Sequence, residues 1–213
     1  MSTVNWRRRL CLNVALLGGL GLAGLMPLTA LANGLTDDAA MKLVQSTADQ
    51  VIHEIAARQA DLDKDPGVLL DIVDKTLLPE VDSERMSRLV LGRYWRTASA
   101  GQKAAFTEQF KRLLVRTYAG PLSKLGNQTI KVTGTKPGAD KDEIEVLSVV
   151  SGGDMGSVPV DYRLTAVDGQ WKAYDVVIDG ISLINNYRGS FAQVIQQKGL
   201  DSLIATLKTQ NNG

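Results

Sequence analysis

Few side chains in this sequence have the chemistry of acids, bases, nucleophiles or metal ligands. The 213 residues include one histidine, His53, and one cysteine, Cys11. Catalysis by histidine needs a positioned partner, but His53 and Glu54 lie in a segment with the periodicity of an amphipathic helix. One histidine and one cysteine cannot form the usual zinc sites, and no G-x-S-x-G, H-E-x-x-H or phosphate-binding loop follows residue 32. The sequence therefore predicts no catalytic residue, no metal and no cofactor, and favours a protein that is not an enzyme.

The carboxylates are numerous, but their spacing is typical of loops and strand surfaces. Asp61, Asp63 and Asp65 alternate like calcium ligands, yet the glycine and the closing glutamate of a calcium-binding loop are missing. Asp175 and Asp179 interrupt an apolar strand and its exit, so they either form a polar site or follow from strand geometry. Strand alternation favours the second interpretation, with Asp175 facing outward and Asp179 in a turn.

The N-terminal segment has the pattern of a secretory signal peptide. Three arginines at positions 7–9 precede an apolar run over residues 10–28, and Ala30 and Ala32 form a small-residue ending. This pattern predicts cleavage after Ala32 and secretion of the remaining chain. The alternative is an uncleaved membrane anchor, for which the apolar run is just long enough.

Removal of residues 1–32 leaves a single predicted domain over residues 33–213. The removed segment holds three arginines and no acid, so the net charge falls from +1 to −2. The only cysteine also leaves with it. A mildly acidic domain lacks the basic surface expected of a nucleic-acid-binding protein.

Hydrophobic periodicity predicts helices at both ends of this domain and strands between them. Apolar residues recur at three- and four-residue steps in segments 36–60, 68–77, 82–97, 99–121, 182–195 and 200–207. Alternation with a period of two begins near Asn127 and covers residues 130–132, 144–146, 160–167 and 171–178. Asp168-Gly169 is a hairpin signal between the last two of these. We therefore expect an α+β fold in which helices cover a twisted, antiparallel, four-stranded sheet.

Two segments on these elements have an unusual order of aromatic and charged residues. The first reads LGRYWR from Leu91 to Arg96, and the second reads WKAYDVVIDGISLINNYRGSFAQVIQQKGLDSLIATLK from Trp171 to Lys208. Together they resemble the MlaC family, also called the toluene-tolerance family, over the chain from about Met41 to Lys208. The resemblance implies a phospholipid-binding protein of the Mla (maintenance of lipid asymmetry) system in the Gram-negative periplasm.

The same resemblance implies cargo, partners and a site. A monomeric carrier would accept phospholipid from the outer-membrane Mla lipoprotein complex and pass it to the inner-membrane Mla transporter complex, maintaining outer-membrane lipid asymmetry. The tails would lie in an apolar pocket between helices and sheet. The candidate lining residues are Leu91, Tyr94, Phe110, Leu114 and Tyr118 on the helical side, Tyr162, Leu164, Tyr174, Val176 and Ile178 on the sheet side, and Ile181, Ile184 and Tyr187 as the closure.

Arg188 is the candidate contact for the headgroup phosphate, with a plain surface residue as the alternative. For the tail pocket, we expect Tyr174→Glu to reduce bound lipid without unfolding the domain. The rival to the carrier hypothesis is a periplasmic protein-binding module of the same fold with a solid core and no lipid cargo, because periodicity cannot distinguish a packed core from a tail-lined pocket.

Overall fold

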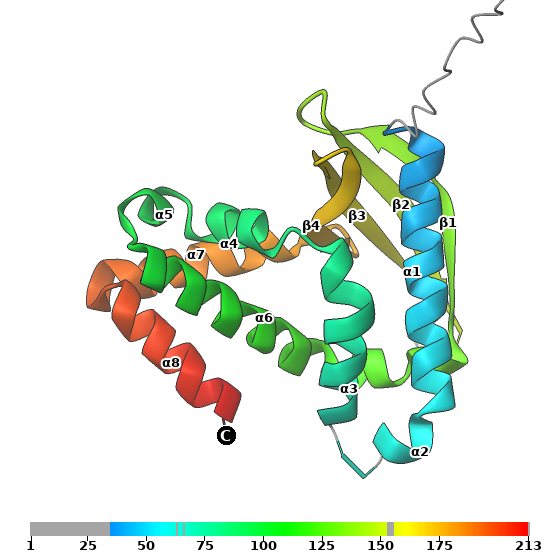
Figure 1. Ribbon diagram of the computed structural model, residues 1–213, viewed down its shortest axis with the longest axis horizontal. Coiled ribbons are helices and arrows are strands. Elements are labelled where there is room, and N and C mark those ends of the chain that lie inside the picture. The colour runs from blue at the N-terminus through cyan, green and yellow to red at the C-terminus, as the bar shows by residue number, and fades with distance from the viewer. Residues whose placement is uncertain (1–34, 63, 66, 153–155, 213) are drawn as a thin grey trace, which may run out of the picture. The chain divides into compact units, whose positions relative to one another are not determined.

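The elements follow the order helices, strands, helices, which confirms the predicted α+β class (Figure 1). The computed structural model describes residues 35–62, 64–65, 67–152 and 156–212. The predicted signal peptide lies outside the described residues.

The first helices begin and end where the sequence supplies caps and breakers. Thr36 caps the first helix, and its Oγ1 accepts a hydrogen bond from the amide of Ala39 at 3.1 Å. The elements are α1 (Asp37–Ala57), α2 (Gln59–Leu62), α3 (Gly67–Ile72), the π-helical turn η1 (Val73–Leu77) and the 3₁₀ turn η2 (Leu78–Glu80). Pro79 lies in the last turn, near the predicted end of this helical run.

The predicted helix over residues 82–97 is two helices in the structure. α4 (Ser83–Leu91) and α5 (Arg93–Thr97) meet at Gly92, whose φ of 55° and ψ of −121° favour glycine. Ser99 then begins α6 (Ala100–Ser123) with a capping box: its Oγ accepts from the Gln102 amide at 3.2 Å, and the Gln102 side chain accepts from the Ser99 amide at 2.9 Å. The short turn η3 (Leu125–Asn127) leads into the sheet.

We expect Gly92→Ala to lower the free energy of unfolding by about 1–3 kcal/mol, because a Cβ is strained at this backbone conformation. The control is Gly189→Ala in an exposed part of a later helix, where an added Cβ meets nothing within 4 Å. The Gly189→Ala substitution should raise the free energy of unfolding by about 0.5–1 kcal/mol. Urea unfolding of both variants measures the difference, and equal stabilities would contradict the argument.

Five antiparallel strands form one sheet in the order β1-β2-β3-β4-β5, one strand more than predicted. They are β1 (Thr129–Pro137), β2 (Glu143–Ser151), β3 (Ser157–Val167), β4 (Gln170–Ile178) and β5 (Ile181–Ser182). The prediction of four strands is wrong because two-residue β5 is too short to show periodicity. Both turns around β4 have positive φ, at Asp168-Gly169 and at Asp179-Gly180, which confirms the predicted hairpin and the turn role of Asp179.

A β-bulge in β4 decides which side chains share a face of the sheet. Arg163 of β3 pairs with Asp175, but its neighbour Leu164 pairs with Ala173, so Tyr174 is the extra residue. Paired residues on adjacent strands point to the same side. On this basis one face carries Leu164 and is apolar, whereas the other carries Arg163 and Asp175 and is charged.

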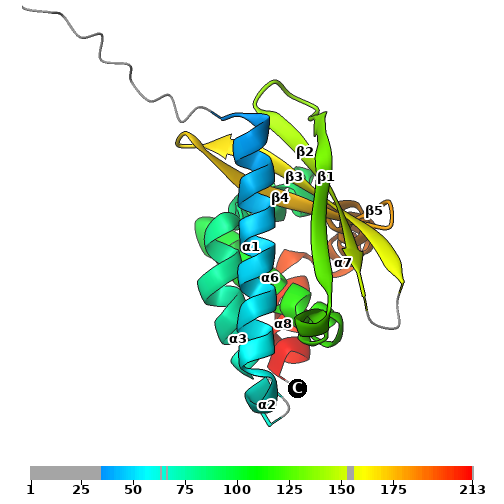
Figure 2. The same ribbon diagram turned by 90° about the vertical axis from the view of Figure 1, so that its right-hand side faces the viewer.

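α1 covers part of the apolar face (Figure 2). The side chains that meet there form the α1–sheet cluster: Ala40, Val44, Ile144, Val146, Leu164 and Trp171. The Gln45 side chain also pairs with the outer edge of β1, donating to the Ile130 carbonyl at 2.8 Å and accepting from the Val132 amide at 3.0 Å. This contact covers an edge that would otherwise be open to pairing with another strand.

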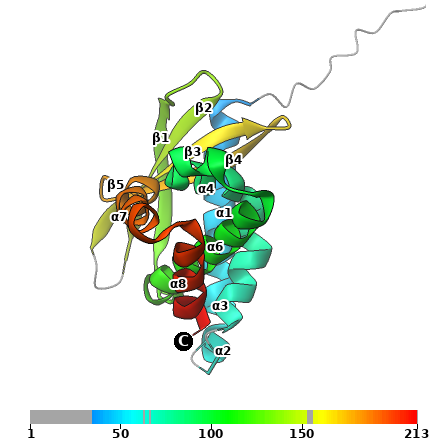
Figure 3. The ribbon, with the colours of Figure 1, turned by 90° about the vertical axis from the view of Figure 1, so that its left-hand side faces the viewer.

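The remaining helices pack mainly on one another, and Figure 3 shows α4, α6, α7 and α8 from the side opposite to α1. α7 (Leu183–Lys198) and α8 (Leu200–Asn212) complete this layer. Its core, the helical cluster, consists of Met86, Val90, Leu91, Trp95, Phe106, Phe110, Tyr174, Ile184, Phe191, Ile195, Leu203 and Leu207. A third cluster joins α1, α3 and α6 through Val51, Ile55, Leu62, Leu69, Ile72, Val73 and Val115. The interior of the described chain is therefore divided among three clusters.

Candidate functional site

The apolar face of the sheet continues beyond the part that α1 covers. Three cross-strand pairs lie there, Val150 with Val158, Val160 with Ile178, and Tyr162 with Val176. All six side chains are half-buried. We call these six residues the open apolar face. It occupies β2, β3 and β4 toward the β2–β3 turn and the β4–β5 turn.

The open apolar face is not sealed by the core. Except for Tyr162, which touches the α1–sheet cluster, its residues belong to none of the three clusters in the described chain. Burial raises the pKa of Tyr162 to about 12, although the side chain keeps some accessible surface. This surface can therefore accept apolar ligand atoms without displacing a packed core.

The raised pKa of Tyr162 predicts a loss of stability at alkaline pH. The ordinary tyrosine pKa is 10.0, and the folded value is about 12. The folded state holds this proton more tightly, so its stabilising contribution is complete below pH 10 and is lost as the pH rises from about 10 to about 12. We expect this residue to lower the free energy of unfolding by up to about 1.4 kcal/mol per pH unit in this range. Urea unfolding across this pH range should show a smaller decrease in the free energy of unfolding for Tyr162→Phe than for the wild-type protein. Identical dependence on pH in the two proteins would contradict the raised pKa of Tyr162.

The opposite face carries a ladder of alternating charges across four strands. Lys136 lies 3.8 Å from Glu145, Glu145 lies 3.1 Å from Arg163, and Arg163 lies 3.0 Å from Asp175. Asp175 also accepts hydrogen bonds from Ser182 Oγ at 2.6 Å and from the Ile184 amide at 3.1 Å. The carboxylate thus links β4 to the start of α7, where the partial positive charge of the helix favours an anion.

The prediction that Asp175 faces outward to solvent is wrong, because its exposed fraction is 1%. The residue does point away from the apolar face, as alternation requires. However, the N-terminus of α7 covers it, and sequence periodicity carries no information about that long-range contact.

Tyr174 also lies away from the open apolar face. Its hydroxyl donates to Glu143 Oε2 at 2.9 Å, and the Arg85 guanidinium lies 4.5 Å from its ring centroid. Arg85 forms an ion pair with Glu143 and donates to Thr165 Oγ1 at 3.1 Å. Burial, together with Glu143, raises the pKa of Tyr174 to about 12. Tyr174→Glu would place a second carboxylate beside Glu143, so we no longer expect this variant to separate lipid binding from folding.

The structure divides the predicted pocket residues among different environments. Leu91, Phe110, Tyr174 and Ile184 are buried in the helical cluster, with Tyr94, Leu114 and Tyr187 packed against it, whereas Leu164 is buried and Tyr162 packed in the α1–sheet cluster. Val176 and Ile178 lie on the open apolar face, together with Val150, Val158 and Val160, which were not among the predicted site residues. Their signal was the alternation along β2 and β3, which places Val150 on the face of Val146 and places Val158 and Val160 on the face of Tyr162.

The predicted closure residues also differ in exposure. Ile181 is 61% exposed and lies in β5, where it pairs with Ile178 of the open apolar face. Tyr118 is half-buried, and burial raises its pKa, with a smaller contribution from Tyr187. Tyr187 contacts Phe110 edge to face at 5.3 Å between ring centroids. Arg188 is exposed, and its Nε donates to the Leu89 carbonyl at 2.8 Å.

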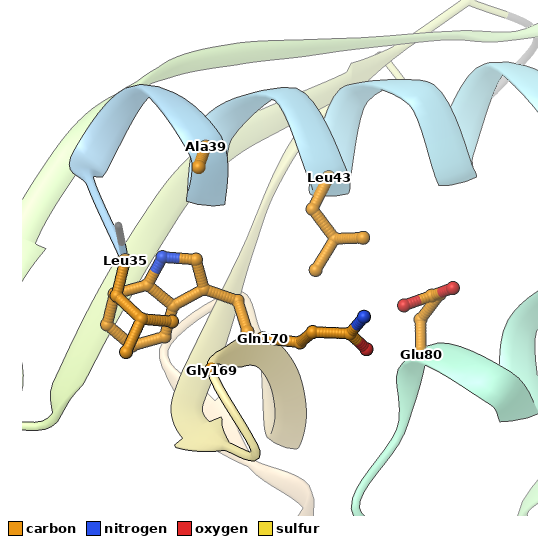
Figure 4. A pocket seen from close by; sticks show the side chains of 7 residues that line it. Leu35, Ala39, Leu43, Glu80, Gly169 and Gln170 are labelled. Carbon is orange, nitrogen blue, oxygen red and sulfur yellow. The ribbon is translucent and has the colours of Figure 1, made fainter. Parts of the chain in front are cut away.

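Two surface pockets lie elsewhere, and neither is lined by a predicted site residue. One, of about 300 Å³, lies between the start of α1 and the β3–β4 hairpin, with Leu35, Leu43 and Gln170 among its walls (Figure 4). The other, of about 410 Å³, is lined by residues that include Arg85, Arg88 and Lys172. Both volumes are at the low end for small-ligand sites. We therefore place the candidate site at the open apolar face.

The remaining chemistry of the described residues is sparse. His53 is exposed. No group of three or more histidine, cysteine or acidic side chains in the described chain is placed to hold a metal ion. Within the same residues, no helix has the length and apolar character needed to cross a membrane.

Fold and site together define an α+β protein with a partly covered apolar sheet face, a class suited to holding apolar molecules. The chain belongs to the MlaC family: the family model described as "MlaC protein" matches residues 45–209. It is similar to the intermembrane phospholipid transport system binding protein MlaC of Haemophilus influenzae, with 29% identity over 169 residues, covering 78% of this chain and 79% of that protein. It is also similar to the toluene tolerance protein ttg2D of Pseudomonas putida, with 30% identity over 186 residues, covering 86% of this chain and 84% of that protein.

A solved structure has the same fold. It is that of the phospholipid-binding protein from Ralstonia solanacearum in complex with a phospholipid, with a TM-score of 0.75 and 30% sequence identity. The match covers 81% of this chain and 97% of that one. The resemblance inferred from the two sequence segments is thereby confirmed at the level of family and fold.

Proposed function

We propose that this protein is a phospholipid carrier that holds acyl tails against the open apolar face. The observation that supports it most directly is the set of half-buried apolar side chains that no core cluster covers in the described chain. The helical-side candidates, among them Tyr94, Leu114, Tyr118 and Tyr187, would contact the other side of the tails. Two relatives described above are named for phospholipid binding or transport.

The energetics require that such a carrier works with partners. Two long acyl chains contain roughly thirty methylenes, and burying them is worth on the order of 25 kcal/mol. Release into water is therefore very slow, whereas transfer between two apolar environments has a net cost near zero. We infer that the protein shuttles phospholipid between the outer-membrane Mla lipoprotein complex and the inner-membrane Mla transporter complex, as a monomer.

Location and headgroup contact complete the proposal. The predicted signal peptide of residues 1–32 would deliver a domain of residues 33–213 to the periplasm. Arg188 would lie near the headgroup phosphate, since its Nε is held by the Leu89 carbonyl while its two terminal nitrogens have no hydrogen-bond partner among the described residues. The protein would have no catalytic role, because moving a lipid changes no covalent bond.

Native mass spectrometry of protein purified from periplasm without detergent tests the proposal. We expect a mass excess that matches one or more phospholipids, with lipid extraction to identify them. A bare protein mass, unchanged after incubation with phospholipid vesicles and both Mla complexes, would refute the carrier and leave the protein-binding module with a solid core.

A further inference from the structure

Exposed arginines gather where α4, α5 and α7 meet. Arg88 lies on α4, which packs against α7, and Arg93 and Arg96 lie on α5, which follows α4 directly (Figure 1). Arg188 of α7 borders them through its bond to the Leu89 carbonyl. None of these four has an acidic partner within 4.0 Å among the described residues, although Glu84 lies one helical turn before Arg88. We call Arg88, Arg93 and Arg96 the arginine surface.

Within the arginine surface, the Arg93 side chain is held in place by contacts that leave its charge unpaired. The Arg93 guanidinium lies 4.9 Å from the Tyr94 ring centroid, and its Nη2 donates to the Tyr94 hydroxyl at 2.9 Å. The positive φ of Gly92 fixes the corner from which α5 leaves α4. Nearby, Lys103 Nζ lies 5.3 Å from the Trp95 ring. Arginine guanidinium groups form bidentate hydrogen bonds with carboxylates, and arginine is enriched in protein interfaces.

We infer that the arginine surface docks against an acidic surface of the membrane complexes that exchange lipid with this protein. The inference rests on the proposed function, because a carrier that cannot release tails into water must dock. Because Arg188 lies next to the arginine surface, the headgroup end of the cargo would lie next to the docked partner.

A protein partner fits these residues better than a membrane surface. Proteins that lie on membranes combine basic residues with apolar side chains that enter the lipid. The exposed large apolar residues of the described chain are Leu35, Leu70 and Ile181, and none lies on α4 or α5. The domain without residues 1–32 also has a net charge of −2, which opposes long-range attraction to an anionic bilayer.

The test is a charge reversal, Arg93→Glu with Arg96→Glu, in the mature protein. Its Kd for each Mla complex, held in phosphatidylcholine nanodiscs, is measured by biolayer interferometry. We expect the Kd for at least one complex to rise about tenfold or more at low salt. The wild-type Kd should approach that of the variant near 1 M salt, where the screening length is about 3 Å. The matched control, Lys131→Glu with Lys208→Glu, makes the same change in charge at two exposed sites and should shift Kd less than about twofold.

Native mass spectrometry of the same variants distinguishes docking from cargo binding. Unchanged lipid occupancy in the arginine variant, together with the raised Kd, supports docking. Lost occupancy would overturn it by placing these arginines in the lipid site. The inference would be overturned if the arginine variant bound both complexes with wild-type affinity, or if the wild-type protein bound neither complex. Flotation with phosphatidylglycerol vesicles tests binding to an anionic membrane. If the variant lost only this vesicle binding, the inference would also be overturned. Wild-type protein without phospholipid would refute the proposed function, while the Kd comparison would still report docking.

Discussion

Replacing Asp175 with alanine is expected to lower the free energy of unfolding by about 3–5 kcal/mol, because it removes a buried carboxylate that pairs with the half-buried Arg163 and accepts hydrogen bonds from two buried donors. The carboxylate is 1% exposed and pairs with Arg163 at 3.0 Å. Its removal also leaves the Ser182 hydroxyl and the Ile184 amide without their acceptor. Both groups are buried, so each loses a bond that water does not replace.

Urea unfolding and thermal melting measure this effect. For a domain of this size, the loss corresponds to a decrease in Tm of about 6–20 °C. The ladder supplies the control: Lys136 is at its exposed end, with 60% of its side chain accessible, and Lys136→Ala should cost less than about 1 kcal/mol. Ser182→Ala, which keeps the carboxylate but removes one donor and the α7 cap, should cost about 1–2 kcal/mol.

A loss below about 1 kcal/mol for Asp175→Ala would contradict the role assigned to this carboxylate. Asp175→Asn separates charge from hydrogen bonding, because the amide can still accept from the Ser182 hydroxyl. We expect an intermediate loss for this variant. If Asp175→Asn and Asp175→Ala were equally destabilised, the ion pair with Arg163 would carry the whole effect.

Local signals explain why much of the fold was predictable from the sequence. Helix caps at Thr36, Ser99 and Ser182 act through bonds to amides three residues away. The Asp168-Gly169 hairpin likewise depends only on the backbone freedom of two adjacent residues. These elements were placed correctly because their causes lie within a few residues of sequence.

Non-local register explains why the site was only partly predictable. The bulge at Tyr174 changes the phase of β4, so Tyr174 joins the helical cluster while Val176 remains with Tyr162. Both side chains have the same alternating pattern in the sequence. Helix stripes have the same limitation: Phe110 is fully packed and Tyr118 is half-buried, although both follow the apolar periodicity of α6. Periodicity identifies inward-facing residues but does not show which of them remain uncovered.

Val160→Glu is expected to reduce the phospholipid-bound fraction at least about tenfold while the domain stays folded. Val160 lies on β3 between Ser148 and Ile178, on the open apolar face. A carboxylate facing acyl tails loses its hydration without a partner, which costs several kcal/mol. Each 1.4 kcal/mol of lost binding free energy weakens retention about tenfold. The fold should tolerate the change because Val160 is half-buried and belongs to no core cluster in the described chain.

Val149→Glu is the matched control, because Val149 is also a half-buried strand valine but lies on the opposite face. Both substitutions lose β-propensity of up to about 1 kcal/mol, so their unfolding free energies should be similar. Native mass spectrometry of the two variants then isolates the effect of the face. Lipid loss in Val160→Glu with normal occupancy in Val149→Glu would locate the tails on the open apolar face. Equal occupancy in both variants would place the tails elsewhere, and Val160→Leu, which keeps the face apolar, should retain lipid in either case.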